Sequence, residues 1–123
     1  MNRNDLKKRL NDFAHRCVNL ALSLPEKPLG KHIRGQLIRC STSASANYRA
    51  ACIAQSRPSF VAKIGIVIEE LDESAYWLEF VIDEKLLPAK RVFSLLNEAN
   101  ELTKIFVSAR KTIKLGKIEN IKS

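Results

Sequence analysis

Apolar residues recur every three or four positions in four blocks between Leu6 and Ile113. A side chain that returns about every 3.5 residues stays on one side of an α-helix, so each block predicts a helix with one apolar stripe. The first two stripes are Leu6, Leu10, Phe13, Cys17, Leu20, Leu24 and Ile33, Leu37, Cys40, Ala44, Asn47, Ala51, Ala54. The other two are Phe60, Ile64, Val67, Leu71, Ser74, Leu78, Val81 and Val92, Leu95, Ala99, Leu102, Phe106, Ala109, Ile113.

Short connections that contain proline or glycine separate the four blocks. Asn4 is expected to cap the start of the first helix. Pro25 and Pro28 cannot continue a helix, so this helix should end near Leu24. Gly116 is the expected terminator of the last helix. The remaining helices are expected at about 31–55, 58–86 and 89–114. Because short connections make successive helices antiparallel neighbours, the pattern predicts an all-α, up-down-up-down four-helix bundle.

The length of 123 residues suits one domain, so we expect a single bundle over 1–123 in which 115–123 is a frayed tail. No stretch approaches the roughly 20 apolar residues that span a bilayer. The first ten residues, MNRNDLKKRL, are charged where a signal peptide needs an apolar core. We therefore expect a cytoplasmic protein that has no membrane partner.

The cysteine and histidine residues do not form a metal-ligand pattern. Cys17, Cys40 and Cys52 are odd in number and lack a CxxC pair, and the first two lie on apolar stripes, as reduced core cysteines do. Carboxylate-bridged metal sites in helical bundles need Glu-x-x-His pairs, but no histidine follows His32. His15 lies on a different helix from His32. We expect no metal and no other cofactor.

Nothing in the sequence assembles a catalytic group. Asp12 and His15 lie one helical turn apart and could act as an acid–base pair, and Ser41 carries an available hydroxyl. No third residue is placed in the sequence to orient them. The acidic residues at 69–73 are nearly contiguous on a helix, so their side chains diverge. We therefore expect a protein that is not an enzyme.

The formal net charge is +8, and it is distributed unevenly. Residues 1–57 carry eleven basic and three acidic side chains, whereas residues 58–84 carry one basic and seven acidic ones. Basic faces of this kind neutralise nucleic-acid phosphates, although no known recognition motif accompanies them. The candidate RNA- or DNA-binding residues are Lys7, Lys8, Arg9, Arg16, Lys31, Arg34, Arg39 and Arg49. An equally open alternative is that this charge only meets the acidic helix of a neighbouring subunit.

The third helix has a second patterned face outside its core stripe. The candidate self-association residues on this face are Ile66, Glu70, Glu73, Trp77 and Phe80. An aromatic and acidic face differs chemically from the basic helices, so two copies would pair head to tail, which generates closed rings. The alternative is that Trp77 and Phe80 merely widen the core stripe.

Three polar residues fall near the core stripe of the second helix. Asn47 lies on the stripe, and Gln36 and Ser43 lie along the same edge. A buried asparagine needs a hydrogen-bond partner and can set the register between helices. We expect these residues to be core polar groups rather than ligand contacts.

The segment SASANYRAACIAQSRPSFVAKIGIVIEELDESAYWLEF, residues 43–80, resembles the four helix bundle protein family, found in intervening sequences of bacterial large-subunit ribosomal RNA genes. The matching positions are Gln36-Leu37, Ala46-Asn47, Ser59-Phe60, Ile68-Glu69-Glu70-Leu71 and Asp72-Glu73-Ser74. Many members read Asn-Ile-Ala-Glu-Gly where this chain has Asn47-Tyr48-Arg49-Ala50-Ala51, which places it with a variant subgroup.

The resemblance implies an antiparallel four-helix bundle, assembly into a homopentamer, no known catalysis and an affinity for nucleic acid. A related accessory protein of diversity-generating retroelements forms a basic pentameric barrel that partners a reverse transcriptase. The resemblance therefore also implies a nucleic-acid enzyme as a possible class of partner.

Overall fold

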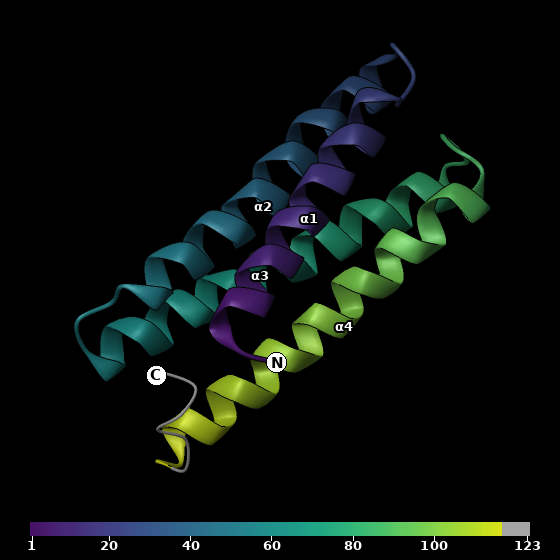
Figure 1. The fold of residues 1–123 in the computed structure, drawn as a ribbon. Coiled ribbons are helices and arrows are strands. Elements are labelled where there is room, and N and C mark those ends of the chain that lie inside the picture. The colour runs from purple at the N-terminus through teal and green to yellow at the C-terminus, as the bar shows by residue number, and fades with distance from the viewer. Residues whose placement is uncertain (117–123) are drawn as a thin grey trace.

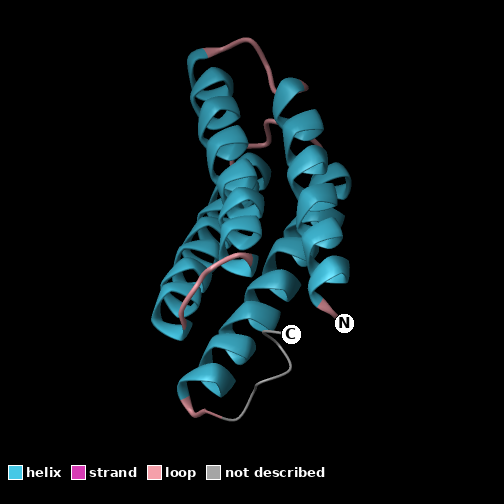
Figure 2. Ribbon diagram, turned by 60° about the vertical axis from the view of Figure 1, so that its left-hand side comes forward, coloured by secondary structure: helices cyan, strands magenta, loops and turns pink. Residues whose placement is uncertain are grey.

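The computed structural model describes residues 1–116, which form four long helices and no strand. The helices are α1 (Arg3–Leu22), α2 (Pro28–Cys52), α3 (Arg57–Asp83) and α4 (Ala89–Lys114). Successive helices run antiparallel (Figure 1), and short loops join them at the two ends of the bundle (Figure 2). The predicted up-down-up-down bundle is confirmed. A frayed tail was expected at 115–123, and its residues after 116 lie outside the part of the chain that the structure describes.

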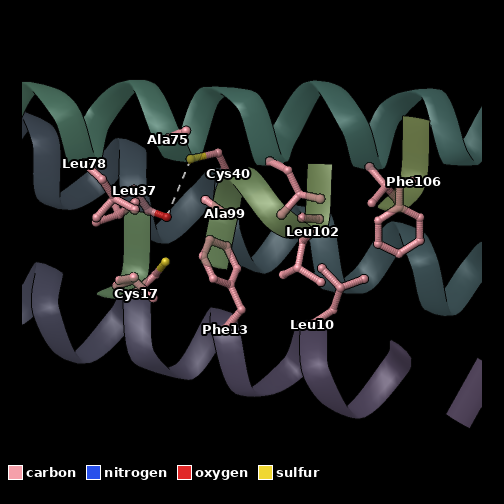
Figure 3. Close-up of a cluster of buried hydrophobic side chains, with 14 of the residues drawn as sticks. Leu10, Phe13, Cys17, Leu37, Cys40, Ala75, Leu78, Ala99, Leu102 and Phe106 are labelled. Carbon is pink, nitrogen blue, oxygen red and sulfur yellow. Dashed lines mark hydrogen bonds between the residues drawn. The ribbon is translucent and has the colours of Figure 1, made fainter. Parts of the chain in front are cut away.

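The four apolar stripes form the core as predicted. Every member of the first and third stripes is buried, and Figure 3 shows side chains from all four helices meeting at the centre. Phe13 and Phe106 are the largest side chains that are fully enclosed. Asn47, Ala54 and Ala109 are the members that are only half-buried. The four stripes thus account for most of the interior.

Tyr48 occupies core space that the pattern assigned to its neighbour Asn47. The Tyr48 side chain is 2% exposed, and its ring meets Phe106 edge to face with 5.0 Å between centroids. Adjacent helix positions differ by about 100° around the axis, so a small rotation of α2 decides which of the two faces inward. The larger apolar surface of tyrosine favours its burial.

The first helix begins two residues earlier than expected because Asn2, not Asn4, caps it. The Asn2 side-chain oxygen accepts a hydrogen bond of 2.8 Å from the Asp5 backbone N–H. The Asp5 carboxylate accepts one of 3.2 Å from the Asn2 N–H. This reciprocal capping box satisfies two otherwise unpaired backbone donors. The prediction of Asn4 as the cap was wrong.

The last helix ends as expected. Gly116 has a φ of +71°, and its N–H donates to the Ile113 carbonyl at 2.9 Å. This left-handed conformation suits glycine, which has no Cβ to clash. The three earlier helices each end two or three residues before the expected position, because residues 23–24, 53–54 and 84–86 form tight turns that still donate to helix carbonyls.

The helix pairs are not equally close. Backbones pack tightly between α1 and α2, between α2 and α3 and between α3 and α4, whereas α1 and α4 approach less closely along their length. Long side chains therefore bridge α1 and α4. None of the four helices is long and apolar enough to cross a membrane.

Candidate self-association and nucleic-acid surfaces

Arg9, on the side of α1 that faces α4, forms ion pairs with two carboxylates of α4. Its Nε and one terminal nitrogen each donate to a Glu98 carboxylate oxygen at 2.8 Å, and Glu101 lies 3.2 Å away. These hydrogen bonds are the main reason that the pKa of Glu98 lies below its usual value, and the charge of Arg16 adds to the effect. The charge of Arg9 is thus paired within the bundle.

Four more of the predicted nucleic-acid residues also have carboxylate partners within the chain. Lys31 and Arg34 pair with Glu26 beside the first loop. Arg39, on α2, reaches across to Glu70 and Glu73 on α3, and holds the pKa of Glu73 below its usual value. The fourth pair is Lys8 with Asp12, at 2.9 Å on the surface of α1.

The remaining three predicted cations form no ion pair among the described residues. They are Lys7, Arg16 and Arg49. They lie in three different grooves, so the eight candidates do not make one continuous basic face. Helix periodicity explains this result, because residue 7 points from α1 toward the end of α2, whereas residue 16 points toward α4.

Arg49 lies in a groove between α1 and α2 of about 410 Å³. The groove walls carry polar side chains, among them His15 and Asn11 from α1 and Thr42 from α2. Its floor is formed by small residues that let the two helices approach closely. His15 is exposed here, and Asp12 pairs with Lys8 instead, so the imagined Asp12–His15 catalytic pair is not formed.

Aromatic side chains cluster on the edge of α3. Trp77 meets Tyr76 at 4.9 Å and Phe80 at 6.0 Å between ring centroids, and His32 from α2 meets it edge to face at 5.5 Å. Trp77 and Phe80 pack against the core, which agrees with the alternative that they widen the core stripe. Tyr76 is 53% exposed and extends the cluster to the surface.

The predicted self-association residues lie at the border between α2 and α3. Ile66, Glu70, Glu73, Trp77 and Phe80 are all half-buried within the chain. Arg39 takes up both carboxylates, and the Trp77 indole N–H donates to Glu73 at 3.2 Å. The two acidic groups expected to face another copy are therefore neutralised internally.

The free negative charge of α3 lies one step around the helix, on a stripe that we call the α3 outer face. It is centred on the exposed ring of Tyr76. Its members are Glu69, Asp72, Tyr76, Glu79 and Asp83. All five are exposed, and none of these carboxylates forms an ion pair within residues 1–116.

The three expected core polar residues lie at the edge of the core instead. Gln36, Ser43 and Asn47 are half-buried, and the Asn47 amide donates to the Ser43 carbonyl and hydroxyl of its own helix at 2.9 and 3.0 Å. An asparagine that is satisfied within its own helix does not set the register between helices. The register-setting role assigned to it was therefore wrong.

The polar groups that are fully buried are Ser41 and Ser74. The Ser74 hydroxyl donates to the Glu70 carbonyl at 2.8 Å and to the Cys40 sulfur at 3.2 Å. The Cys40 thiol in turn lies 3.7 Å from the Leu37 carbonyl, the dashed contact in Figure 3. Burial raises the pKa of Cys40 to about 11 and raises that of Cys17 further. These thiols are protonated core groups rather than nucleophiles.

No three histidine, cysteine, aspartate or glutamate side chains cluster as metal ligands within the described part of the chain. Cys17, Cys40 and Cys52 are free thiols.

Two features of these surfaces were missed from the sequence. The first is Tyr76, which directly precedes the predicted Trp77. Adjacent residues differ by about 100° around a helix, as Asn47 and Tyr48 do, so Tyr76 is exposed where Trp77 is half-buried. The second is Arg91, which lies in the first turn of α4 and lines the groove between α1 and α4 together with Arg16. Its signal was its spacing of seven residues before Glu98, which places both on one side of α4.

An antiparallel four-helix bundle with a net positive charge defines the general class of this protein. Within that class, the chain belongs to the 23S rRNA-intervening sequence protein family, whose sequence profile matches residues 2–108. The resemblance noted from residues 43–80 is confirmed at the level of the family.

A solved relative supports the same assignment. It is the crystal structure of a protein with unknown function from the S23 ribosomal protein family of Bacteroides thetaiotaomicron. The two chains share 34% sequence identity and align with a TM-score of 0.80, over 91% of this chain and 100% of the other. No curated protein sequence matches this chain.

Proposed function

We propose that this protein is a non-catalytic bundle that associates with copies of itself through the α3 outer face. The observation that carries the proposal is the placement of free negative charge. Within residues 1–116, every carboxylate that neither forms an ion pair nor caps a helix lies on α3 or at Glu84, directly after it. The rest of the surface has an excess of lysine and arginine, so a second copy offers the complementary charge.

The exposed aromatic ring supports burial against a protein partner. Tyr76 lies at the middle of the acidic stripe and is backed by Trp77 and Phe80, so it is held in place before any contact forms. Preordered aromatic side chains carry much of the binding energy of interfaces. Because the acidic and basic faces differ, the contact is head to tail and closes into a ring. A pentamer is the number that the family resemblance implies.

The replacement of Tyr76 by lysine tests this proposal. Tyr76 is exposed, so Tyr76→Lys leaves the bundle folded while it places a cation and removes the ring at the centre of the contact. The matched control is Phe93→Lys, which changes an aromatic residue of similar exposure, 52%, on α4.

We expect light scattering to give an oligomer for the wild type and for Phe93→Lys, and a smaller species for Tyr76→Lys. A monomeric wild type, or a Tyr76→Lys variant whose mass is unchanged, would overturn the proposal. Circular dichroism confirms that each variant remains helical.

A second function, binding to the backbone of RNA or DNA, is favoured by a separate observation. The cations without an ion pair in residues 1–116 outnumber the free carboxylates, and most are exposed on α1, α2 and α4. They include Lys7, Arg16, Arg49, Lys90, Arg91, Lys104, Lys111 and Lys114. Such charge binds phosphates without strong sequence selectivity and depends strongly on salt. A nucleic-acid enzyme as a further partner follows only from the family resemblance.

A gel-mobility series with unrelated RNA and DNA sequences across salt concentrations tests the second function. We expect similar affinities for all sequences and a steep loss of binding as salt increases. Absence of a shift at low salt would leave self-association as the sole function proposed. Preference for one sequence would exclude the backbone-directed mode.

A further inference from the structure

The groove between α1 and α4 is lined by two arginines, one from each helix. Arg16 and Arg91 line it together with Asn19, above a floor of Leu20 and Leu95, and the groove encloses about 260 Å³. We call it the Arg16–Arg91 groove. Arg91 is not among the residues that sequence analysis selected.

A second position one heptad away shows what this site lacks. Seven residues before Arg16 on α1 is Arg9, and seven residues after Arg91 on α4 is Glu98. Because the helices are antiparallel, these steps lead along the groove in the same direction. There, Arg9 meets Glu98 and Glu101 in a network of charge-assisted hydrogen bonds. One heptad away along the groove, the same pairing of helix positions places Arg16 at the position of Arg9 and Arg91 at the position of Glu98.

The two arginines have only neutral partners in the described residues. Arg16 donates to the Ser94 hydroxyl at 2.9 Å, and Arg91 donates to the Ser23 hydroxyl at 3.2 Å. Ser94 is the α4 residue seven positions before Glu101, so both carboxylates of the Arg9 site are replaced, one by a cation and one by a hydroxyl. Both oxygens of Glu98 are already engaged by Arg9. Arg16 lies near enough to Glu98 for its charge to lower the pKa of that carboxyl, but neither Arg16 nor Arg91 forms an ion pair within residues 1–116. The Arg16–Arg91 groove therefore keeps an excess of positive charge.

The start of α4 adds to the positive potential. Arg91 lies in the first turn of α4, which contains no acidic residue, and Pro88 provides no side-chain cap. The N-terminus of a helix carries a partial positive charge that favours anions and disfavours nearby cations. Lys90 and Arg91 are the charged residues of that turn. An anion in the groove would relieve this repulsion.

We propose that the Arg16–Arg91 groove is a phosphate-binding site. The guanidinium groups are planar donors that match phosphate oxygens, and the Asn19 amide adds another donor at the rim. The phosphate that this groove binds belongs to the backbone of a nucleic acid. Only this assignment of the phosphate rests on the nucleic-acid function proposed above. Free inorganic phosphate has the same chemistry and is distinguished by experiment.

The decisive variant is Arg91→Glu, which recreates at Arg16 the ion pair that Arg9 forms with Glu98. We expect it to raise the melting temperature, because two cations that line one groove become a cation and an anion, and to abolish phosphate binding. The matched control is Lys90→Glu, which makes the same charge change at the adjacent, exposed residue, outside the groove lining. Misfolding is not expected for either variant, since both positions are on the surface.

The first measurement is a titration with inorganic phosphate at constant ionic strength, followed by NMR of the arginine Nε–H groups. We expect phosphate, but not chloride, to shift the signals of Arg16 and Arg91 in the wild type and in Lys90→Glu. Absence of these shifts in the wild type overturns the site, whether or not the protein binds nucleic acid.

The second measurement is the affinity for a short labelled single-stranded RNA. We expect Arg91→Glu to weaken binding about tenfold, as the loss of charge-assisted hydrogen bonds predicts, and Lys90→Glu to have a much smaller effect. Equal losses for the two variants would mean that net charge alone matters, which overturns the nucleic-acid source. Phosphate shifts without RNA binding would show that the groove holds the free ion and that the nucleic-acid function fails.

Light scattering provides the remaining outcome. If Arg91→Glu reduces the mass of the oligomer while phosphate shifts neither arginine signal, the acidic helix of a second copy fills the groove. That result would replace the phosphate site with an interface.

Discussion

At the scale of single residues, burial decides which changes matter. Leu71 lies in the middle of α3 with its side chain fully buried, and its neighbours come from the shared core. Lys8 has a side chain that is 77% exposed and pairs only with Asp12. A buried methyl group contributes through contacts that water cannot replace, whereas an exposed ion pair contributes little.

Leu71→Ala is expected to lower the free energy of unfolding by ~2–5 kcal/mol, because it leaves a cavity in a closely packed core. Chemical denaturation of the parent and the variant measures the difference. Lys8→Ala is the surface control and should change stability little. A Leu71→Ala protein as stable as the parent would show that the apolar stripe of α3 does not form the core.

The Arg9–Glu98 pair gives a prediction about pH. The pKa of Glu98 is lowered in the folded state, so the pair stabilises the fold above the unfolded value of 4.5, and this contribution disappears as pH falls through the folded pKa. Glu98→Gln should therefore cost about 1 kcal/mol at neutral pH and progressively less below pH 4.5. Unfolding curves of both proteins across this range test it. A constant difference at every pH would contradict the assignment.

At the scale of helices, two glycines of α2 have opposite roles. A Cβ on Gly30 would lie 2.1 Å from the Pro25 carbonyl oxygen, so the loop between α1 and α2 folds against the helix only because that atom is absent. Gly35, in the helix interior, would bring its Cβ near no other atom. The first glycine positions the connection, and the second only weakens the helix.

Gly30→Ala is expected to destabilise the protein by about 1–3 kcal/mol, since backbone must move to accommodate the methyl group. Gly35→Ala should stabilise it by about 0.5–1 kcal/mol through lower chain entropy in the unfolded state. Thermal melts of the two variants test the pair. Equal effects would contradict the close approach of Pro25 to α2.

At the scale of the whole molecule, the separation of charge has a measurable consequence. The free carboxylates of the α3 outer face and the free cations of the other helices attract across a contact between copies, and salt screens such attraction. Internal pairs such as Arg39 with Glu70 and Glu73 are formed already and do not drive association.

We expect the oligomer to dissociate more readily as salt rises from about 0.05 M to about 0.5 M, which shortens the Debye length. Light scattering at fixed protein concentration measures the mass. An oligomer whose mass does not depend on salt would mean that the contact is mainly apolar and that the acidic stripe is not part of it.

The helices and their stripes could be predicted because they are local properties. A spacing of three and four residues defines a helix face without knowledge of the rest of the chain, and Pro25 and Gly116 stop helices through their own backbone geometry. Pro28 differs from the other two, because it is the first residue of α2. The short connections determine the antiparallel order. Residues in the middle of each stripe, such as Leu37 and Leu102, were placed correctly.

The edges of the stripes, and the pairing of charges, were decided only by the tertiary structure. Adjacent positions such as Asn47 and Tyr48, or Tyr76 and Trp77, differ by one step around the helix, and packing of the whole core sets the rotation that buries one and not the other. Arg9 and Glu98 are 89 residues apart, and Arg16 lines one groove with Arg91 only because of the register of α1 against α4. Sequence spacing within a helix contains no information about that register, which depends on how all four apolar faces fit at once.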